Sequence, residues 1–171
     1  MISIRAASID DYALITTMGK QTFLESHGHS ASPADINAYI NEKYTTEVIL
    51  PELSNTSNHY HILFYDNQPA GYSNIVLNSI HPNISLSPAT KLDRIYILQE
   101  FFHLKLGSFL LNFNVQVAKE KEQQGMWLYV WTENHRAVHF YTKNKFTIIG
   151  RYDFRISATH TNPNHLMLRL L

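Results

Sequence analysis

The sequence of 171 residues contains no cysteine, and this absence excludes disulfide bonds, thiolate metal sites and cysteine nucleophiles. A chain without disulfides fits a reducing compartment, so we expect a cytoplasmic location. The sequence also has no excess of either charge, because 14 Lys and Arg residues balance 14 Asp and Glu residues. Without a broad basic surface, we expect no nucleic-acid partner.

Long apolar segments are missing as well. No stretch approaches the roughly 20 apolar residues that cross a bilayer, and the N-terminal MISIRAASIDDY lacks the apolar core of a signal peptide. We therefore expect no membrane partner. The patterns G-x-S-x-G, H-E-x-x-H and Gly-Lys-Ser/Thr are also absent. The length suits a single domain, which we expect to cover residues 1–171.

Histidine, in contrast, is plentiful, and its ten residues suggest a metal site. His27 and His29 are two residues apart, and so are His59 and His61 on a predicted strand. Two histidines on one strand face can chelate a metal ion, but the spacing supplies no third ligand with supporting carboxylates. We therefore predict no metal site.

Strand and helix signals alternate along the chain. Strands are expected over residues 2–6, 92–98, 126–131, 146–154 and 165–171, with a hairpin over 59–78 that turns at Asp66-Asn67. Helices are expected after a Ser8–Asp11 capping box, from Ser32-Pro33, from Gly107 to about Gln124 with Gly125 at the end, and after Asn134. Because a crossover helix joins 92–98 to 126–131, these two strands should be parallel, whereas the hairpins should be antiparallel. The expected fold is α/β (α+β), with a mixed, mostly antiparallel sheet and helices on both faces.

The segment QEFFHLKLGSFLL, residues 99–111, joins a predicted strand to a predicted helix. The first N–H groups of a helix are unpaired and lie at the positive end of its dipole, so they bind phosphate well. Gly107 would let the backbone approach such an anion closely. The residues before it, however, are Phe102 to Lys105, where a phosphate-binding loop usually has glycines. On these residues alone, the segment is either a phosphate-binding turn or an ordinary strand-to-helix turn.

Two longer patterns resemble the GNAT superfamily of acetyl-CoA-dependent N-acetyltransferases. RIYILQEFFHLKLGSFLL, residues 94–111, is similar to the strand, turn and helix that bind acetyl-CoA in that family. WTENHRAVHFYTKNKFTIIG, residues 131–150, resembles the family segment N..A..FY.k.GF, which is matched by Asn134, Ala137, Phe140, Tyr141 and Phe146. The opening ISIRAASIDDYALI is typical of the first strand and helix. QTFLESHG at 21–28, with Asp35 and Tyr39, resembles the polyamine and ribosomal-protein acetyltransferase branches.

The family turn reads Q/R-x-x-G-x-G/A, and the matching positions here are Phe102, Lys105 and Gly107. Only Gly107 agrees, but Lys105 adds a cation, and the backbone N–H groups do not depend on the side chains. The resemblance therefore implies that acetyl-CoA binds as a co-substrate and that no metal is involved. The residues implied for its pyrophosphate are His103, Leu104, Lys105, Leu106, Gly107 and Ser108.

The resemblance also implies roles for the neighbouring strands. In the family, the strand before the turn splays away from its parallel neighbour, and its exposed backbone pairs with the pantetheine amides. The matching residues here are Tyr96, Ile97 and Leu98, and a backbone N–H near Leu98 would bind the developing oxyanion. A fully paired core strand is the alternative. Asn134 would hydrogen-bond the cofactor as well as cap its helix.

Tyr141 is implied to be the general acid. A tyrosine hydroxyl, with a reference pKa of about 10 against about 8.5 for a thiol, can protonate or hydrogen-bond the departing thiolate. The alternative is a half-buried aromatic ring whose hydroxyl reaches water.

The general base is less well defined by the sequence. Asp93 and Glu25 rank first, because an acidic side chain would also attract a cationic amine. Lys91 stands where the family often has a Glu. His27, Tyr96 and a chain of water molecules are further alternatives.

The function implied by the resemblance is transfer of acetyl from acetyl-CoA to a primary amine by direct attack in a ternary complex. The expected acceptor is a small-molecule amine or a peptide N-terminus that enters between the 21–32 and 79–90 loops, and homodimer formation is left open. Two alternatives remain. One is a GNAT-like module that binds CoA or acyl-CoA without turnover, suggested by the changes at Phe102 and Lys105. The other is an unrelated α/β binding domain.

Overall fold

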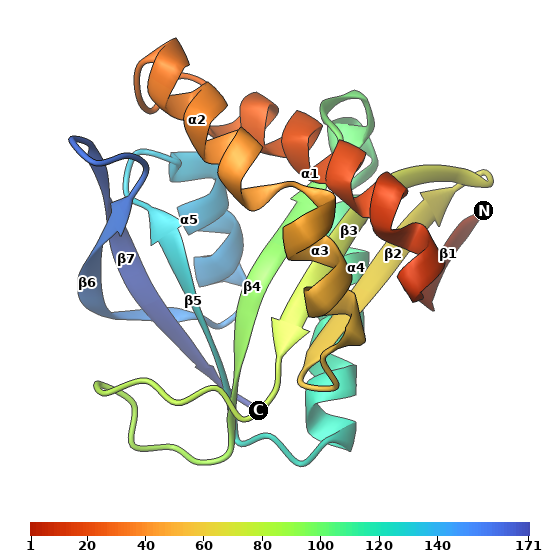
Figure 1. Cartoon of the computed structure of the whole chain (residues 1–171). Coiled ribbons are helices and arrows are strands. Elements are labelled where there is room, and N and C mark those ends of the chain that lie inside the picture. Colours follow the sequence, from red (N-terminus) through yellow and green to blue (C-terminus); the bar gives the residue numbers. More distant parts are fainter.

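One seven-stranded sheet organises the chain, with its strands in the order β1-β2-β3-β4-β5-β7-β6 (Figure 1). The computed structural model describes every residue from Met1 to Leu171. The strands are β1 (Ile2–Ala6), β2 (Asn58–Tyr65), β3 (Gln68–Val76), β4 (Ala89–Ile97), β5 (Gly125–Trp131), β6 (Thr147–Arg155) and β7 (Thr161–Leu170). The helices are α1 (Tyr12–His27), α2 (Pro33–Lys43), α3 (Thr46–Ser54), α4 (Leu106–Glu120) and α5 (His135–Lys143).

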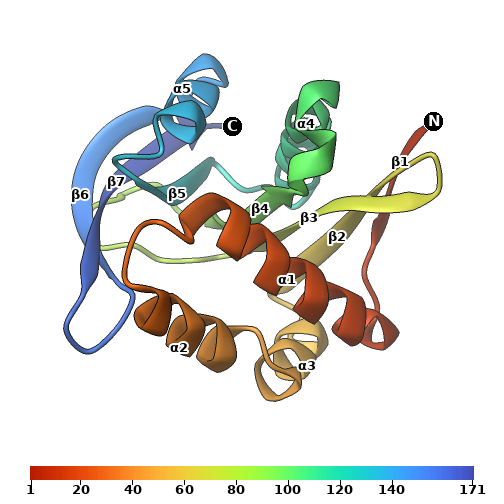
Figure 2. The same ribbon diagram turned by 90° about the horizontal axis from the view of Figure 1, so that it is seen from above.

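The helices cover both faces of this sheet. Figure 2 shows α1, α2 and α3 on one face and α4 and α5 on the other. All neighbouring strands are antiparallel except β4 and β5, which are parallel. The predicted fold class is therefore confirmed. No helix has both the length and the apolar character needed to cross a membrane.

The parallel pair is short. β4 and β5 are in register only at Ala89–Gly125, Thr90–Met126 and Lys91–Trp127. Beyond Lys91 the two strands diverge, as Figure 1 shows, because β4 follows β3 while β5 follows β7. The divergence implied by the family resemblance is confirmed, and the fully paired alternative is wrong.

Side chains on β5 alternate between two different environments. Met126, Leu128 and Val130 are buried against the face covered by α4, in one cluster with Leu111 and Val115. The intervening residues Trp127, Tyr129 and Trp131 project to the opposite face, as the twofold period of a strand requires. A strand that is apolar throughout therefore supplies core on one side and aromatic rings on the other.

Several local signals in the sequence are confirmed. The Ser8 N–H donates to Asp11 Oδ2 at 2.7 Å within a capping box, and the Asp35 N–H donates to Ser32 Oγ at 3.2 Å at the start of α2. Asp66 and Asn67 both adopt positive φ, 47° and 65°, which suits the tight turn between β2 and β3.

Helix α3 is missing from the predicted elements. Pro51 lies in its interior, and proline normally interrupts a helix because it has no N–H to donate. The helix is held from outside instead: Ile49 is completely buried, and Glu52 pairs with Arg94 of β4. Tertiary contacts thus override the local signal.

The predicted end of α4 is also wrong. The helix ends at Glu120, and Gly125 begins β5 instead of ending the helix. Glu122 takes the left-handed conformation, with φ of 56°, its N–H donates to the Lys119 carbonyl at 2.9 Å, and the Gln123 N–H donates to the Ala118 carbonyl at 3.0 Å. This is a Schellman motif with glutamate at a position where glycine is usual, so the sequence does not reveal it.

Candidate active site

A cavity of about 640 Å³ opens where β4 and β5 diverge. Its walls come from both strands, from the turn that follows β4, and from α1, α2, α4 and α5. A volume of this size suits a small molecule or part of a larger cofactor. The cavity brings together residues from most of the segments that the sequence singles out.

The wall supplied by β4 is polar on the side of α1 and α3. Asp93 has no partner on β3, because Leu92 pairs with Ile75 and Arg94 pairs with Asn74. Such a bulge changes the direction of the side chains around it. Both Asp93 and Arg94 line the cavity as a result.

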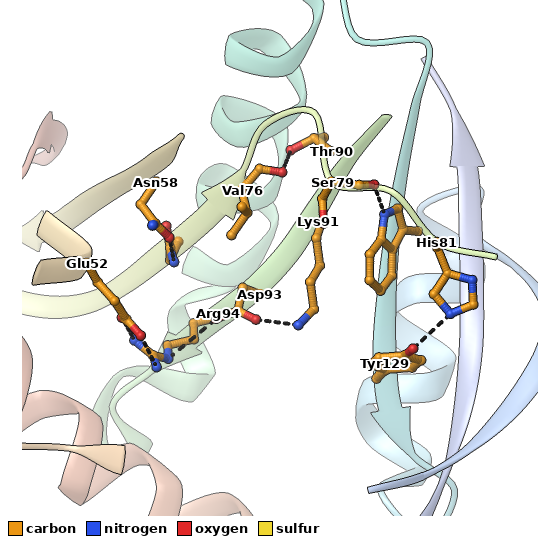
Figure 3. Close-up of polar contacts among 12 residues, drawn as sticks. Glu52, Asn58, Val76, Ser79, His81, Thr90, Lys91, Asp93, Arg94 and Tyr129 are labelled. Carbon is orange, nitrogen blue, oxygen red and sulfur yellow. Dashed lines mark hydrogen bonds and ion pairs between the residues drawn. The ribbon is translucent and has the colours of Figure 1, made fainter. Parts of the chain in front are cut away.

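A chain of ion pairs crosses this wall, and Figure 3 shows its members side by side. Glu52 Oε2 lies 2.6 Å from Arg94 Nη1, Arg94 Nε lies 3.7 Å from Asp93 Oδ2, and Asp93 Oδ1 lies 2.6 Å from Lys91 Nζ. Burial acts to raise the pKa of the Asp93 carboxyl, but Lys91 and Arg94 outweigh it and the pKa is lowered. Asp93 therefore lies where the sequence predicts, but as the counter-ion of two cations it is a poor base.

Glu25 lies elsewhere. It is not among the residues that line the cavity. Its Oε2 accepts a hydrogen bond from the Gln99 N–H at 2.9 Å, and its Oε1 accepts one from Gln21 at 3.0 Å. The carboxylate thus anchors the segment after β4 to α1, and this position argues against the predicted role as a base.

The turn after β4 combines a 3₁₀ segment, Gln99–Leu104, with a left-handed residue. Lys105 has φ of 57° and ψ of 23° and is the N-cap of α4. The Ser108 N–H donates to the Lys105 carbonyl at 3.2 Å, whereas Leu106 and Gly107, as the first two residues of α4, have no carbonyl within the helix for their N–H groups. The turn therefore presents free backbone donors at the positive end of a helix.

Four of the six predicted turn residues line the cavity, namely Lys105, Leu106, Gly107 and Ser108, while His103 and Leu104 do not. The packing of the chain does not require a glycine at position 107. A Cβ added there would meet Phe140 at 3.7 Å, an ordinary contact, and its φ is not positive. The bare backbone at Gly107 therefore leaves room on the cavity side, where an anion would approach.

The exposed edge of β4 is formed by alternate residues. The Leu98 N–H donates to the Ala70 carbonyl at 2.9 Å, so Leu98 directs its N–H toward β3. By the alternation of an antiparallel ladder, Ile97 directs its own N–H and carbonyl to the other side, where β5 has diverged. The free donor near Leu98 is consequently the Ile97 N–H, since the Leu98 N–H itself is already bonded. Tyr96 and Ile97 line the cavity, and Leu98 does not.

The opposite wall carries Asn134 and Tyr141. Asn134 Oδ1 accepts a hydrogen bond from the Ala137 N–H at 3.1 Å, which confirms the predicted cap of α5. Tyr141 lines the cavity, packs against Phe140 and Phe146, and its hydroxyl makes no hydrogen bond with the protein. Burial raises the pKa of Tyr141, so the hydroxyl keeps its proton at neutral pH.

Comparison with known proteins identifies this arrangement. Residues 22–146 match the model of the acetyltransferase (GNAT) family, which is well over half of the chain. The chain belongs to the GNAT acetyltransferase family. It is an acetyl-CoA-dependent N-acetyltransferase, as the resemblance of its two motifs implies. The alternative of an unrelated binding domain is wrong.

The chain aligns with its relatives over most of its own length and most of theirs. The chain is 29% identical over 147 residues to a spermidine N(1)-acetyltransferase of Thermoplasma acidophilum, covering 86% of this chain and 89% of that one. It is 24% identical over 154 residues to an uncharacterized N-acetyltransferase of Lactobacillus delbrueckii subsp. lactis, covering 90% and 88%.

Solved structures agree with this assignment. The PaiA N-acetyltransferase of Thermoplasma acidophilum, in complex with coenzyme A, matches with a TM-score of 0.79 and 25% identity over 100% of this chain and 99% of that chain. The ribosomal-protein-S18-alanine N-acetyltransferase of Escherichia coli shares the fold, with a TM-score of 0.72 and 12% identity over 99% and 94%.

Arg136 is a cavity residue that the sequence reading of this acetyltransferase misses. Its guanidinium carbon lies 3.7 Å from the centre of the Phe102 ring, and both side chains line the cavity beside Lys105. The family has Gln or Arg at the position of Phe102, so Arg136 brings a cation from α5 to the place where one is missing. Arg136 is the only arginine of the ENHRAVHFY motif, and this is the sequence feature that could have indicated its role.

The aromatic residues Phe23 and Trp131 are also not predicted from the sequence. Phe23, His27, Tyr39 and Trp131 form what we call the aromatic side of the cavity. The His27 and Tyr39 rings stack on Phe23, with centroids 4.9 Å and 4.6 Å away, and Trp131 approaches His27 at 6.0 Å. Phe23 and His27 lie one turn apart on α1, but no sequence spacing connects them with Tyr39 of α2 or Trp131 of β5.

Replacing Lys105 with glycine should stabilise the protein. A left-handed conformation costs a residue with a Cβ about 1 kcal/mol, and glycine avoids this cost. We expect Lys105→Gly to raise the melting temperature by roughly 2–4 °C in a scanning calorimeter. Lys105→Ala is the matched control, because it removes the same cation but keeps the strained backbone. An equal gain for both variants would contradict the explanation.

Replacing Arg136 with alanine should weaken CoA binding. A charge-assisted hydrogen bond to phosphate at a partly exposed site contributes about 1.4 kcal/mol, so we expect the dissociation constant for CoA to rise about tenfold in isothermal titration calorimetry. Lys143→Ala removes a cation from the last turn of the same helix and should leave binding unchanged. Equal affinities for Arg136→Ala and the unaltered protein would exclude Arg136 from the phosphate site.

Proposed function

We propose that this acetyltransferase moves acetyl from acetyl-CoA to a primary amine by direct attack in a ternary complex. One observation carries the proposal: the unpaired, protonated hydroxyl of Tyr141 lies on the wall of a cavity between a free strand edge and a helix N-terminus. These are the donors that a thioester with a pyrophosphate tail needs.

The residues present fit acetyl-CoA along one line of the cavity. The N–H groups of Leu106 and Gly107, with the cations Lys105 and Arg136, would hold the pyrophosphate. The open edge of β4 at Ile97 would pair with the pantetheine amides, as an added strand pairs with a sheet edge. The changes at Phe102 and Lys105 are thus matched by compensating groups, which weakens the case for a binding module without turnover.

The chemistry then divides between the two strands. The Ile97 N–H, or another free donor on this edge, would stabilise negative charge that develops on the acetyl oxygen. Tyr141 would donate its proton or a hydrogen bond to the departing sulfur. No residue needs to carry the acetyl group, and the chain has no cysteine to do so.

The acceptor amine would enter from the side of α1 and α2. The polar wall of β4, on the side of α1 and α3, pairs Lys91 with Asp93 and Arg94 with Glu52, so these four charges cancel. A polyamine carries several positive charges and needs carboxylates that are not already paired. Although one relative is a spermidine acetyltransferase, this balance favours an acceptor with a single amine on an apolar or aromatic body.

The experiment that tests the proposal is release of free thiol from acetyl-CoA in the presence of aromatic and aliphatic monoamines, N-terminal peptides and spermidine. We expect turnover with monoamines, and Tyr141→Phe should lower kcat about 100-fold, because general acids typically contribute 100- to 10,000-fold. The affinity for CoA should change little, which calorimetry checks. Turnover of Tyr141→Phe at the unaltered rate would remove Tyr141 from the acid role, and silence across the panel would contradict amine acetylation.

A further inference from the structure

We propose that His27, at the end of α1, is the general base that takes the proton from the attacking amine. This inference rests on the proposed function, because it assigns a group to a step of that reaction. The geometry points to His27 through three observations: its place in the cavity, the hydrogen bond that fixes its tautomer, and the open state of its other ring nitrogen.

The imidazole of His27 is held within the aromatic side of the cavity. It stacks on Phe23 at 4.9 Å with 15° between the planes, lies 6.0 Å from Trp131 of β5, and meets Tyr96 of β4 edge-on at 6.4 Å. These contacts come from three different elements. They place the ring between Tyr96 and the side of α1 and α2 from which the acceptor would enter. Tyr96 precedes Ile97 on the open edge of β4.

A short hydrogen-bond chain determines which nitrogen of His27 carries the proton. Ser26 Oγ lies 2.7 Å from the Thr22 carbonyl and 2.7 Å from His27 Nδ1. A carbonyl can only accept, so for both contacts to be hydrogen bonds the single proton of the Ser26 hydroxyl goes to Thr22. Ser26 Oγ must then accept from His27, which therefore carries its proton on Nδ1 and has a lone pair on Nε2.

Nε2 of His27 is the free end of this chain. It makes no hydrogen bond within the protein, and it is absent from the buried polar atoms that lack a partner, so it is exposed, and its ring lines the cavity. An imidazole whose Nδ1–H is anchored and whose Nε2 lone pair faces substrate is the arrangement of a general base.

Burial and His29 lower the pKa of His27 to about 4, so the ring is neutral across the physiological range. The titratable groups around it are Tyr96 of β4, Tyr39 of α2 and His29 after α1, with Asp93 and Arg94 farther along β4. The tyrosines are neutral because burial raises the pKa of both. No carboxylate contacts the ring to hold it as imidazolium.

The proposed step joins the amine to the acetyl carbon and releases CoA as a free thiol. A neutral amine attacks the acetyl carbon, the new C–N bond forms and the C–S bond breaks. The surplus proton on nitrogen passes to His27 Nε2, and the sulfur receives a proton from Tyr141. Exchange with water then returns His27 and Tyr141 to their starting states.

The first test is the tautomer itself, measured by long-range ¹H–¹⁵N correlation spectra of protein labelled at histidine. We expect His27 as the Nδ1–H form, neutral down to about pH 5, and Ser26→Ala should move it toward the Nε2–H form that prevails in free histidine. An Nε2–H tautomer in the unaltered protein would overturn the proposal. This measurement needs no substrate, so it does not depend on the proposed function.

The second test compares His27→Gln with His29→Gln, an exposed neighbour outside the cavity lining. For the best monoamine, we expect kcat/KM to fall about 100-fold in His27→Gln and less than twofold in His29→Gln. The deficit should stay constant from neutral pH to about pH 9, because the amine attacks in its neutral form in both enzymes and His27 is neutral throughout this range. The CoA affinity of both variants should match that of the unaltered protein.

Two results would overturn the assignment while leaving amine acetylation intact. One is turnover by His27→Gln within threefold of the unaltered enzyme. The other is a loss in His29→Gln that equals the loss in His27→Gln. If the unaltered enzyme acetylates no amine, the proposed function fails, and the spectra still decide the state of His27.

Discussion

The pairing between β4 and β5 ends after Lys91 and Trp127, and the rest of the site depends on this early separation. Each strand keeps its other neighbour, so both remain rigid while the edges between them are left without partners. An unpaired edge inside a protein is costly unless something else satisfies it. In this acetyltransferase, the open edges line a cavity large enough for an extended ligand.

The two faces of the diverging strands carry different kinds of groups. The bulge at Asp93 directs charged side chains to the face of α1 and α3, where Glu52, Arg94, Asp93 and Lys91 neutralise one another (Figure 3). Trp131 and His27 make this end of the cavity aromatic. On the other face, the turn at Lys105 and the start of α5 gather cations and free N–H groups. A thioester lying between the strands would thus have an anion site at one end and an apolar amine site at the other.

The sequence predicts most of the sheet and the residues of the cofactor side, because these depend on local patterns: alternation, caps and the N..A..FY segment. It fails where packing overrides a local signal, as at Pro51 in α3 and at Glu122 after α4. It also fails for pairs distant in the sequence. Nothing in the order of residues connects Arg136 with Phe102 or His27 with Trp131. Charge alone favours Asp93 and Glu25 as bases, but their ion-pair and hydrogen-bond partners are determined only by the folded chain.

The open edge of β4 is tested most directly by amide hydrogen exchange at Ile97, measured by NMR with and without CoA. The free protein should exchange this amide readily, whereas Leu98, bonded to Ala70, should be protected throughout. Saturation with CoA should slow exchange at Ile97 by tenfold or more, because the pantetheine would supply the missing partner. Saturating CoA that leaves exchange at Ile97 unchanged would contradict the claim that the divergence of β4 and β5 forms the cofactor site.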